Sequence, residues 1–188
     1  MKFYAMLGLV LATAIPAAAD DCGVPGWILS GDNPQGYSCG TELVAGTSVK
    51  SAFIKAKDER PQGIATLMQQ IAADPYRGQR LSLSADIKTL DAATAYLWLR
   101  VDGPNHDILK FYNMEDRPVT GTTDWKLYTV VLDVPPEGAV ISFGFFLRGH
   151  GEAWAKGFSL VPVGKDVPVS VMPSSPPPKT PANLDFDQ

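Results

Sequence analysis

The chain has 188 residues, of which 45% are hydrophobic, 10% aromatic and 19% charged, and these proportions fit a soluble globular domain rather than a disordered or fibrous chain. The 16 prolines and 17 glycines favour many turns over long helices. Lysine and arginine number 16 against 20 acidic residues, which gives a formal net charge of −4 with no basic block and argues against a nucleic-acid partner.

The N-terminus has the pattern of a secretory signal peptide over residues 1–19. A positive start is followed by a short apolar run, 6–15, and then by a proline and three alanines that end at Ala19. The apolar run is shorter than the roughly 20 residues that a transmembrane helix needs. A lipoprotein signal does not fit, because two aspartates stand directly before Cys22. The sequence therefore predicts cleavage after Ala19 and a periplasmic or secreted bacterial protein with no membrane span in the mature chain.

Cys22 and Cys39 are the two cysteines of the chain, and both lie in the part predicted to be exported, where thiols are oxidised. A disulfide between them closes a loop of about 17 residues, which stabilises the fold by roughly 3 kcal/mol through loop entropy. A cysteine-based metal site would lack its other ligands. We therefore expect a structural disulfide that ties the mature N-terminus to the first hairpin.

Short segments of alternating apolar residues, separated by turn residues, fill the chain from 24 to 163. The segments are 48–56, 80–90, 93–102, 107–114, 125–133 and 139–148. The stretch 64–73 is somewhat helix-like, but it lies between two strands and is interpreted as another strand. Regular spacing of short strands and turns predicts an all-β antiparallel sandwich or barrel over residues 20–163.

The composition changes after Val163. Residues 164–188 hold six of the 16 prolines, including the run 176–178. Such a segment cannot pair in a sheet, so we expect a disordered proline-rich tail of polyproline character.

The alternation also predicts which face of each strand is buried. In the segment 95–102 the odd-numbered residues form an apolar face, and Tyr96, Trp98, Arg100 and Asp102 form the opposite face.

Neighbouring segments extend the same two faces. The inward side is expected to carry Leu81, Leu83, Ala85, Ile87, Leu109, Phe111, Ile141, Phe143, Phe145 and Leu147. The outward side is expected to carry Ser82, Ser84, Asp86, Lys88, Lys110, Tyr112, Val140, Ser142, Gly144, Phe146 and Arg148.

Aromatic rings beside charged groups on an outward face suit a sugar, because a pyranose has an apolar face that stacks on aromatic rings and a rim of hydroxyls. On this hypothesis the stacking residues are Tyr96, Trp98 and Tyr112, and the hydroxyl-binding residues are Arg100, Asp102 and Arg148. The other interpretation is that a loop or sheet edge covers the aromatic rings, which leaves Arg100 and Asp102 as a structural pair. Both interpretations remain open at this point.

The polar segments 112–118 and 121–125 are interpreted as structural loops. Asp116 and Arg117 are expected to form an ion pair, and Asp124 is expected to cap the turn into the next strand.

The sequence holds no catalytic motif of a known class. Its two histidines, His106 and His150, lie in glycine-rich turns without metal-ligand spacing, so we expect no metal site. A glycosidase needs two facing carboxylates. The available carboxylates are Asp86, Asp102, Glu115, Asp116 and Glu152, and no pattern pairs any two of them. We therefore expect a protein that is not an enzyme and needs no cofactor.

From Gly26 to about Val163 the chain resembles the galactose-binding-like jelly rolls that include many carbohydrate-binding modules. The segments that carry the resemblance are 122–128, 135–146 and 151–161, the last of which looks like their final strand. The resemblance implies an antiparallel jelly-roll sandwich and marks the fold more than the ligand.

The runs 76–78, 98–103 and 113–118 look like a narrower subgroup whose members are sometimes labelled transcriptional regulators, because the module is fused to a DNA-binding domain. This chain shows no helix-turn-helix pattern and is expected to be exported, so that role is rejected here. Where the family has an aspartate pair in its last strand, this chain has Ala155, Lys156 and Gly157. The aspartate helps to hold a structural calcium in such modules, so Lys156 puts a calcium ion in doubt.

Two functions follow as hypotheses. The first is an exported, non-catalytic module that binds a glycan on the face of Tyr96 and Trp98. The second is an envelope protein whose sandwich and proline-rich tail engage a protein partner. A concave, open face around Trp98 would favour the first hypothesis.

Overall fold

The computed structural model describes residues 22–172, 180 and 184. The predicted signal peptide and the proline run 176–178 lie outside the described residues. Within the described ranges, none of the helices has the length and apolar character needed to cross a membrane.

Antiparallel strands make up nearly all of the regular structure, with two short 3-10 turns between them. In chain order the elements are β1 (Ile28–Ser30), η1 (Pro34–Gly36), β2 (Tyr37–Leu43), β3 (Lys50–Ala56), β4 (Ile64–Ala72), η2 (Asp74–Tyr76), β5 (Arg80–Asp102), β6 (Ile108–Tyr112), β7 (Val119–Asp133), β8 (Val140–Arg148) and β9 (Glu152–Val163). The stretch read as a strand at 64–73 is β4. The all-β jelly-roll prediction is confirmed.

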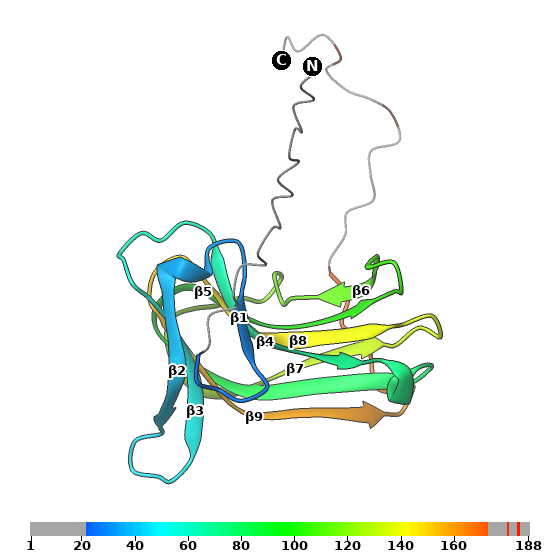
Figure 1. Cartoon of the computed structure of the whole chain (residues 1–188), viewed down its shortest axis with the longest axis horizontal. Helices are drawn as coiled ribbons and strands as arrows, with labels where there is room; N and C mark the ends of the chain where they lie inside the picture. The colour runs from blue at the N-terminus through cyan, green and yellow to red at the C-terminus, as the bar shows by residue number, and fades with distance from the viewer. Residues whose placement is uncertain (1–21, 173–179, 181–183, 185–188) are drawn as a thin grey trace, which may run out of the picture.

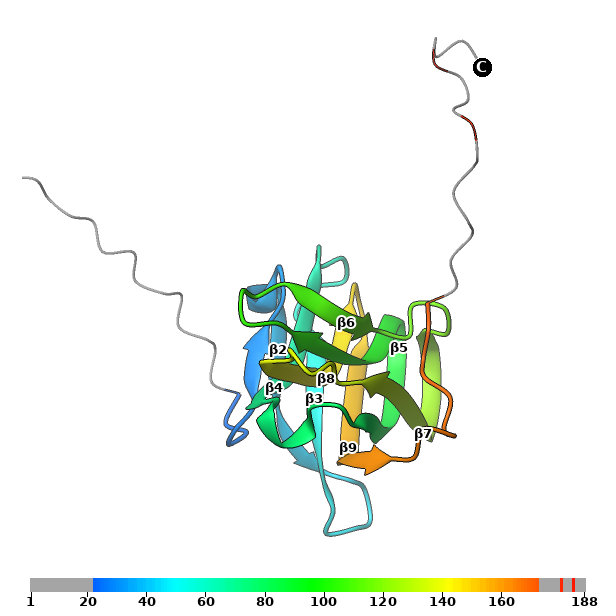
Figure 2. The same ribbon diagram turned by 90° about the vertical axis from the view of Figure 1, so that its right-hand side faces the viewer.

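The strands form two layers that share the long strand β5. The C-terminal half of β5 pairs with β8 and β6, and β8 continues through β4 to β1. The N-terminal half of β5 pairs with β7 and β9, and β9 continues through β3 to β2. We call these layers the first sheet (β1, β4, β8, β5, β6) and the second sheet (β2, β3, β9, β5, β7). The β2–β3 hairpin projects beyond the body of the sandwich in both views (Figure 1, Figure 2).

Strand β5 belongs to both sheets because it bends near Asp91. The sequence predicts two segments here, 80–90 and 93–102, whereas the structure has one strand with shifts in its register against β7. Asp91 has a left-handed φ of 47°. The backbone of Asp91 lies so close to Gly151 that a Cβ added to Gly151 would collide with the backbone of Asp91 and Ala92. The bend lets one strand supply side chains to the outer faces of both sheets.

The core lies between the sheets and follows the predicted alternation. Leu81, Leu83, Ala85 and Ile87 are fully buried from the first half of β5, and so are Ala95, Leu97, Leu99 and Val101 from the second half. Ile141, Phe145 and Leu147 of β8 are fully buried against them. The even-numbered residues of 96–102 lie on the opposite face of the sheet, as expected, but Tyr96, Trp98 and Asp102 are buried there and Arg100 is only partly exposed.

The predicted disulfide between Cys22 and Cys39 is present, with a Cα–Cα distance of 5.2 Å. It joins the segment before β1 to strand β2. Trp27 follows the disulfide and packs against the core, with its ring centroid 4.7 Å from that of Phe158 and 6.1 Å from that of Phe143.

Residues 164–172, which belong to the stretch predicted as a tail, contact the second sheet. Arg80 binds Asp133 through Nε at 2.9 Å and Nη2 at 3.0 Å, and its Nη1 donates to the carbonyl oxygens of Lys165 and Val167. Hydrogen bonds from Arg80 and Lys165 hold the pKa of Asp133 well below its usual range. Further along, the Ser170 amide donates to the Val131 carbonyl.

Candidate functional site

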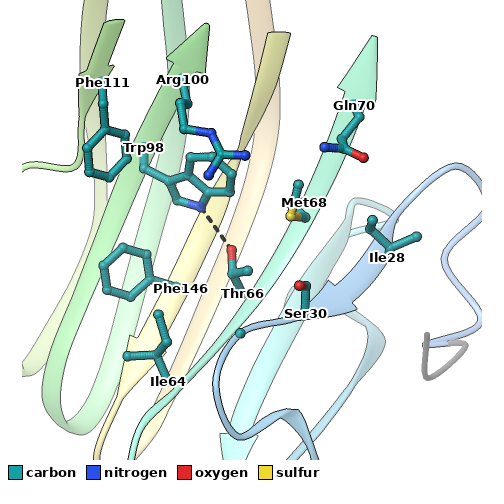
Figure 3. A pocket seen from close by; sticks show the side chains of 11 residues that line it. Ile28, Ser30, Ile64, Thr66, Met68, Gln70, Trp98, Arg100, Phe111 and Phe146 are labelled. Atoms are coloured by element: carbon teal, nitrogen blue, oxygen red, sulfur yellow. Dashed lines mark hydrogen bonds between the residues drawn. The ribbon is translucent and has the colours of Figure 1, made fainter. Parts of the chain in front are cut away.

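The first sheet carries a pocket of about 340 Å³ on its outer face. Eleven residues line it: Ile28, Ser30, Gly31, Ile64, Thr66, Met68, Gln70, Trp98, Arg100, Phe111 and Phe146 (Figure 3). They come from β1, β4, β5, β6 and β8 and from the turns beside them. We call this pocket the Trp98 cleft.

Trp98 forms part of the floor because its neighbour on β8 has no side chain. Trp98 pairs with Gly144, and Gly144 pairs with Met68 on β4. A Cβ on Gly144 would collide with the backbone of β4, so only glycine fits there. The indole crosses β8, and its Nε1 donates to Thr66 Oγ1 at 2.8 Å (Figure 3).

A short chain of hydrogen bonds then fixes this indole. The Thr66 hydroxyl donates onward to the carbonyl of Phe145 at 3.1 Å. The indole N–H is therefore satisfied inside the protein, and Trp98 is only 6% exposed. What the indole adds to the lining of the cleft is its apolar ring and not the N–H group.

Apolar side chains form two edges of the cleft. Phe111 on β6 is 45% exposed, with its ring edge-on to Trp98 at a centroid distance of 6.5 Å. Ile28 on β1 is also exposed, and Met68 lies between these two edges (Figure 3).

Arg100 is the one charged side chain that lines the cleft. Its Nε donates a hydrogen bond to Asp102 Oδ2 at 3.0 Å and lies 2.9 Å from Asp102 Oδ1. Among the described residues, no donor forms a hydrogen bond with Oδ1. Asp102 is buried and does not line the cleft, so it acts as a brace behind Arg100. The brace uses only Nε, and among the described residues no acceptor binds the two terminal nitrogens of the guanidinium. Gln70 adds an amide beside them and donates from Nε2 to Ser142 Oγ at 3.1 Å.

Two further residues of the predicted site share this face but lie outside the cleft. Tyr96 is buried against Phe146, with ring centroids 4.5 Å apart. Arg148 is exposed, and its guanidinium carbon lies 6.0 Å from the centre of the Tyr96 ring. The structure therefore brings Trp98 and Arg100 into one cleft, with Asp102 behind them, and leaves Tyr96 and Arg148 beyond its end.

The prediction for β6 is wrong, because Tyr112 points inward and Phe111 points outward. Tyr112 pairs with core-facing Leu99, and antiparallel partners share a face. The register shifts by one residue between Val101 and Asp102, which reverses the alternation expected from the hairpin. Tyr112 is 2% exposed, and burial raises its pKa. Phe111 takes the aromatic place in the cleft.

The Tyr112 hydroxyl explains the polar loop that follows it. It donates to Asp116 Oδ1 at 2.7 Å and accepts from Arg117 Nε at 3.0 Å. The expected Asp116–Arg117 contact is thus made through the tyrosine, and the loop is structural as predicted. The prediction for 121–125 is wrong, because this segment lies inside strand β7 and there is no turn for Asp124 to cap. Asp124 Oδ1 instead accepts a hydrogen bond from the amide of its neighbour Trp125.

Several residues of the cleft were missed from the sequence. Thr66, Met68 and Gln70 alternate along β4, so an assignment of faces to that strand could have found them. Ile28 and Ser30 lie on a strand of three residues, which is too short to show a period.

The residues present do not fit the calcium ion of the resembling modules. Lys156 Nζ lies 3.2 Å from Asp86 Oδ2, so an ammonium group occupies the surroundings of that carboxylate. Among residues 22–172, 180 and 184, no group of three or more His, Cys, Asp or Glu side chains is placed to hold a metal ion.

No protein-family model matches the chain. A sequence relative is an "uncharacterized HTH-type transcriptional regulator", YbfP of Bacillus subtilis (strain 168), which is 44% identical over 146 residues. The match covers 76% of this chain and 50% of the relative. The chain therefore spans about half the length of the curated relative that it matches.

Solved structures with the same fold include carbohydrate-binding modules. The C-terminal family 22 carbohydrate-binding module of Clostridium thermocellum Xyn10B has a TM-score of 0.56 at 10% identity and covers 75% of this chain and 87% of its own. A CBM4 structure has a TM-score of 0.54 at 17% identity, covering 78% and 93%. The enzymatically active domain of the bacteriophage CBA120 tailspike protein 4 has a TM-score of 0.55 at 16% identity, covering 74% and 20%. The chain thus has the β-sandwich fold of carbohydrate-binding modules.

Proposed function

We propose that this chain is an exported, non-catalytic module that binds a glycan in the Trp98 cleft. The observation that carries the proposal is the pairing of a fixed indole with one braced guanidinium in an otherwise uncharged pocket of about 340 Å³. A sugar ring can lie against Trp98 and Phe111, while Arg100 and Gln70 bind its hydroxyl and ring oxygens.

A non-catalytic role is supported by the position of the carboxylates. None of the residues that line the Trp98 cleft is acidic, whereas glycoside hydrolysis uses two carboxyl groups flanking the bond. Asp86 and Glu152 are ion-paired with Lys156 and Lys55. The lining of the cleft thus suits the binding of a sugar and contains no carboxylic acid to protonate or attack the glycosidic bond.

The comparisons support ligand binding in a general way. The structures of the same fold include modules described as carbohydrate-binding. The relative named as a regulator matches this chain over half of its own length. For this chain we propose export, because the first 19 residues have the signal-peptide pattern and Cys22 and Cys39 are oxidised. A protein partner through residues 164–188 stays a prediction.

The test is a glycan array followed by calorimetry on matched pairs of variants. Phe111→Ala removes an exposed ring from the cleft, and Leu127→Ala removes an exposed side chain from β7 as its control. In a second pair, Arg100→Met removes a guanidinium from the cleft, and Arg148→Met, on the same face but outside the cleft, is its control. We expect Phe111→Ala and Arg100→Met to weaken binding at least about tenfold, or roughly 1.4 kcal/mol, and the controls to bind as the wild type does. Equal binding by all four variants, or no array glycan bound, would refute the proposal.

A further inference from the structure

The second sheet has its own cleft, on the opposite outer face of the sandwich. Its volume is about 330 Å³. The lining residues are Glu42, Leu43, Val44, Ala45, Ser51, Lys88, Asp124, Trp125 and Trp154. We call it the Trp125 cleft. It shares no lining residue with the Trp98 cleft.

A β-bulge gathers the polar groups of this cleft. Lys88 on β5 pairs with Trp154 on β9. On its other side, the register against β7 shifts between Ile87 and Thr89, whose partners are Lys126 and Thr123. Asp124 and Trp125 therefore both stand opposite Lys88. Two residues opposite one is the arrangement of a bulge, which re-aims side chains.

Trp154 and Glu42 form the fixed part of the cleft. The indole Nε1 of Trp154 donates to Glu42 Oε1 at 2.5 Å. Lys55 bridges two carboxylates, with Nζ 3.4 Å from Glu42 Oε2 and 3.0 Å from Glu152 Oε2, and it lies 5.0 Å from the centre of the Trp154 ring. Like Trp98, Trp154 thus has its N–H satisfied internally and presents its ring.

Three polar groups of the cleft are available to a ligand, although Lys156 Nζ already lies 4.7 Å from the centre of the Trp125 ring. Within residues 22–172, 180 and 184, Lys88 has no acidic side chain within ion-pair distance, and its nearest charge-related contact is the Trp154 ring at 5.8 Å. The Nε1 of Trp125 has no hydrogen-bond acceptor in the same described part. Asp124 uses Oδ1 for the Trp125 amide, which leaves Oδ2 free to accept.

We propose that the Trp125 cleft is a second saccharide-binding site, which takes a neutral sugar ring with adjacent hydroxyls. The sugar ring stacks on the partly exposed indole of Trp125. The Asp124 carboxylate accepts a hydrogen bond from one sugar hydroxyl, and the Lys88 ammonium donates one to the adjacent hydroxyl. Asp124 and Lys88 carry opposite charges and together give the cleft no net attraction for the carboxylate of a uronic acid.

Because the two clefts lie on opposite faces, one molecule can hold two separate glycan segments. Linked sites raise the overall affinity for a polymer well above that for an oligomer. The inference therefore goes beyond the Trp98 cleft and does not depend on it.

The test uses the full chain and follows the four indole N–H signals of its tryptophans by ¹⁵N NMR. The probes are xylohexaose, cellohexaose and the neutral oligosaccharides that score on the glycan array. We expect the Trp125 and Trp154 signals to shift. Trp125→Ala and Lys88→Met should each weaken that response at least about tenfold, whereas Lys126→Met, the matched control beside the cleft, should leave it unchanged.

Two outcomes would overturn the proposal. The first is that no probe moves the Trp125 and Trp154 signals. The second is that a peptide of residues 173–188 moves them and the sugars do not, which would assign the cleft to the chain's own proline-rich segment. The Trp98 signal and the Phe111→Ala variant report separately on the first cleft, so the failure of one site is distinguished from the failure of the other.

Discussion

The outer faces of the two sheets use tryptophan in different ways. On the first sheet, Trp98 crosses a neighbouring strand, binds Thr66 and is almost fully buried. On the second sheet, Trp125 is only partly buried, and Lys156 Nζ lies 4.7 Å from the centre of its ring. One indole is built into the sandwich, and the other rests on its surface.

The charges differ in the same way. Arg100 is the single charge in the first cleft, and the buried Asp102 braces it. The second cleft alternates ammonium groups with rings, as Lys55 and Lys88 do on Trp154. On the first face, the side chains of the proposed site therefore also stabilise the fold, whereas on the second face only Trp154 does so.

The largest expected difference between the two faces is in the free energy of unfolding when Trp98 or Trp125 is replaced by alanine. Trp98→Ala removes a buried ring and breaks the bond to Thr66, so we expect a loss of about 3–5 kcal/mol in the free energy of unfolding. Trp125→Ala should lower it by less than about 1 kcal/mol, because the ring is partly exposed. Urea denaturation measures both changes. Equal losses would contradict the distinction, and a large loss in Trp98→Ala makes that variant unsuitable for binding tests.

A second comparison tests the hydrogen bonds that the indole N–H groups of Trp98 and Trp154 donate inside the protein. Thr66→Val leaves the buried Trp98 N–H without its acceptor, at a cost of about 1–3 kcal/mol. Glu42→Gln keeps an oxygen for the Trp154 N–H, so its effect should stay below about 1 kcal/mol. The shift of the urea midpoint, at an unchanged m-value, gives the loss in free energy of unfolding for each variant. A Thr66→Val protein as stable as the wild type would show that the hydrogen bond adds nothing.

The brace behind Arg100 can be tested by a double-mutant cycle. Arg100→Met leaves Asp102 buried without its partner, which should destabilise the fold by about 1–2 kcal/mol. In the double variant with Asp102→Asn the loss should be smaller, because no buried charge is left unpaired. Additive losses in thermal or urea unfolding would mean that the two side chains act independently.

The smallest expected effect concerns the contact of residues 164–172 with the second sheet. Arg80 and Lys165 lower the pKa of Asp133, so this carboxylate stabilises the folded state above its unfolded pKa of about 3.9 and loses that effect as the pH falls through the folded pKa. The stability difference between the wild type and Asp133→Asn should therefore be largest above about pH 5 and narrow below about pH 4. Urea unfolding at a series of pH values measures it, and a difference that grows in acid would have the wrong sign.

The alternation of apolar residues was enough to predict the sandwich and the buried face of β5. It failed for β6, because a register shift after Val101 turns Tyr112 inward and Phe111 outward, and a shift of this kind leaves no mark in the hydrophobic pattern. It also could not show that Gly144 makes room for the Trp98–Thr66 bond, since that contact depends on the register of three strands at once. The bend at Asp91, which joins two predicted segments into β5, is hidden for the same reason.

The most direct test of the account is a crystal structure of the chain with the best oligosaccharide from the glycan array. The account predicts a sugar ring seated against Trp98 and Phe111, with at least one hydroxyl or ring oxygen within hydrogen-bond distance of the terminal nitrogens of Arg100. A bound oligosaccharide that leaves the Trp98 cleft empty would contradict it.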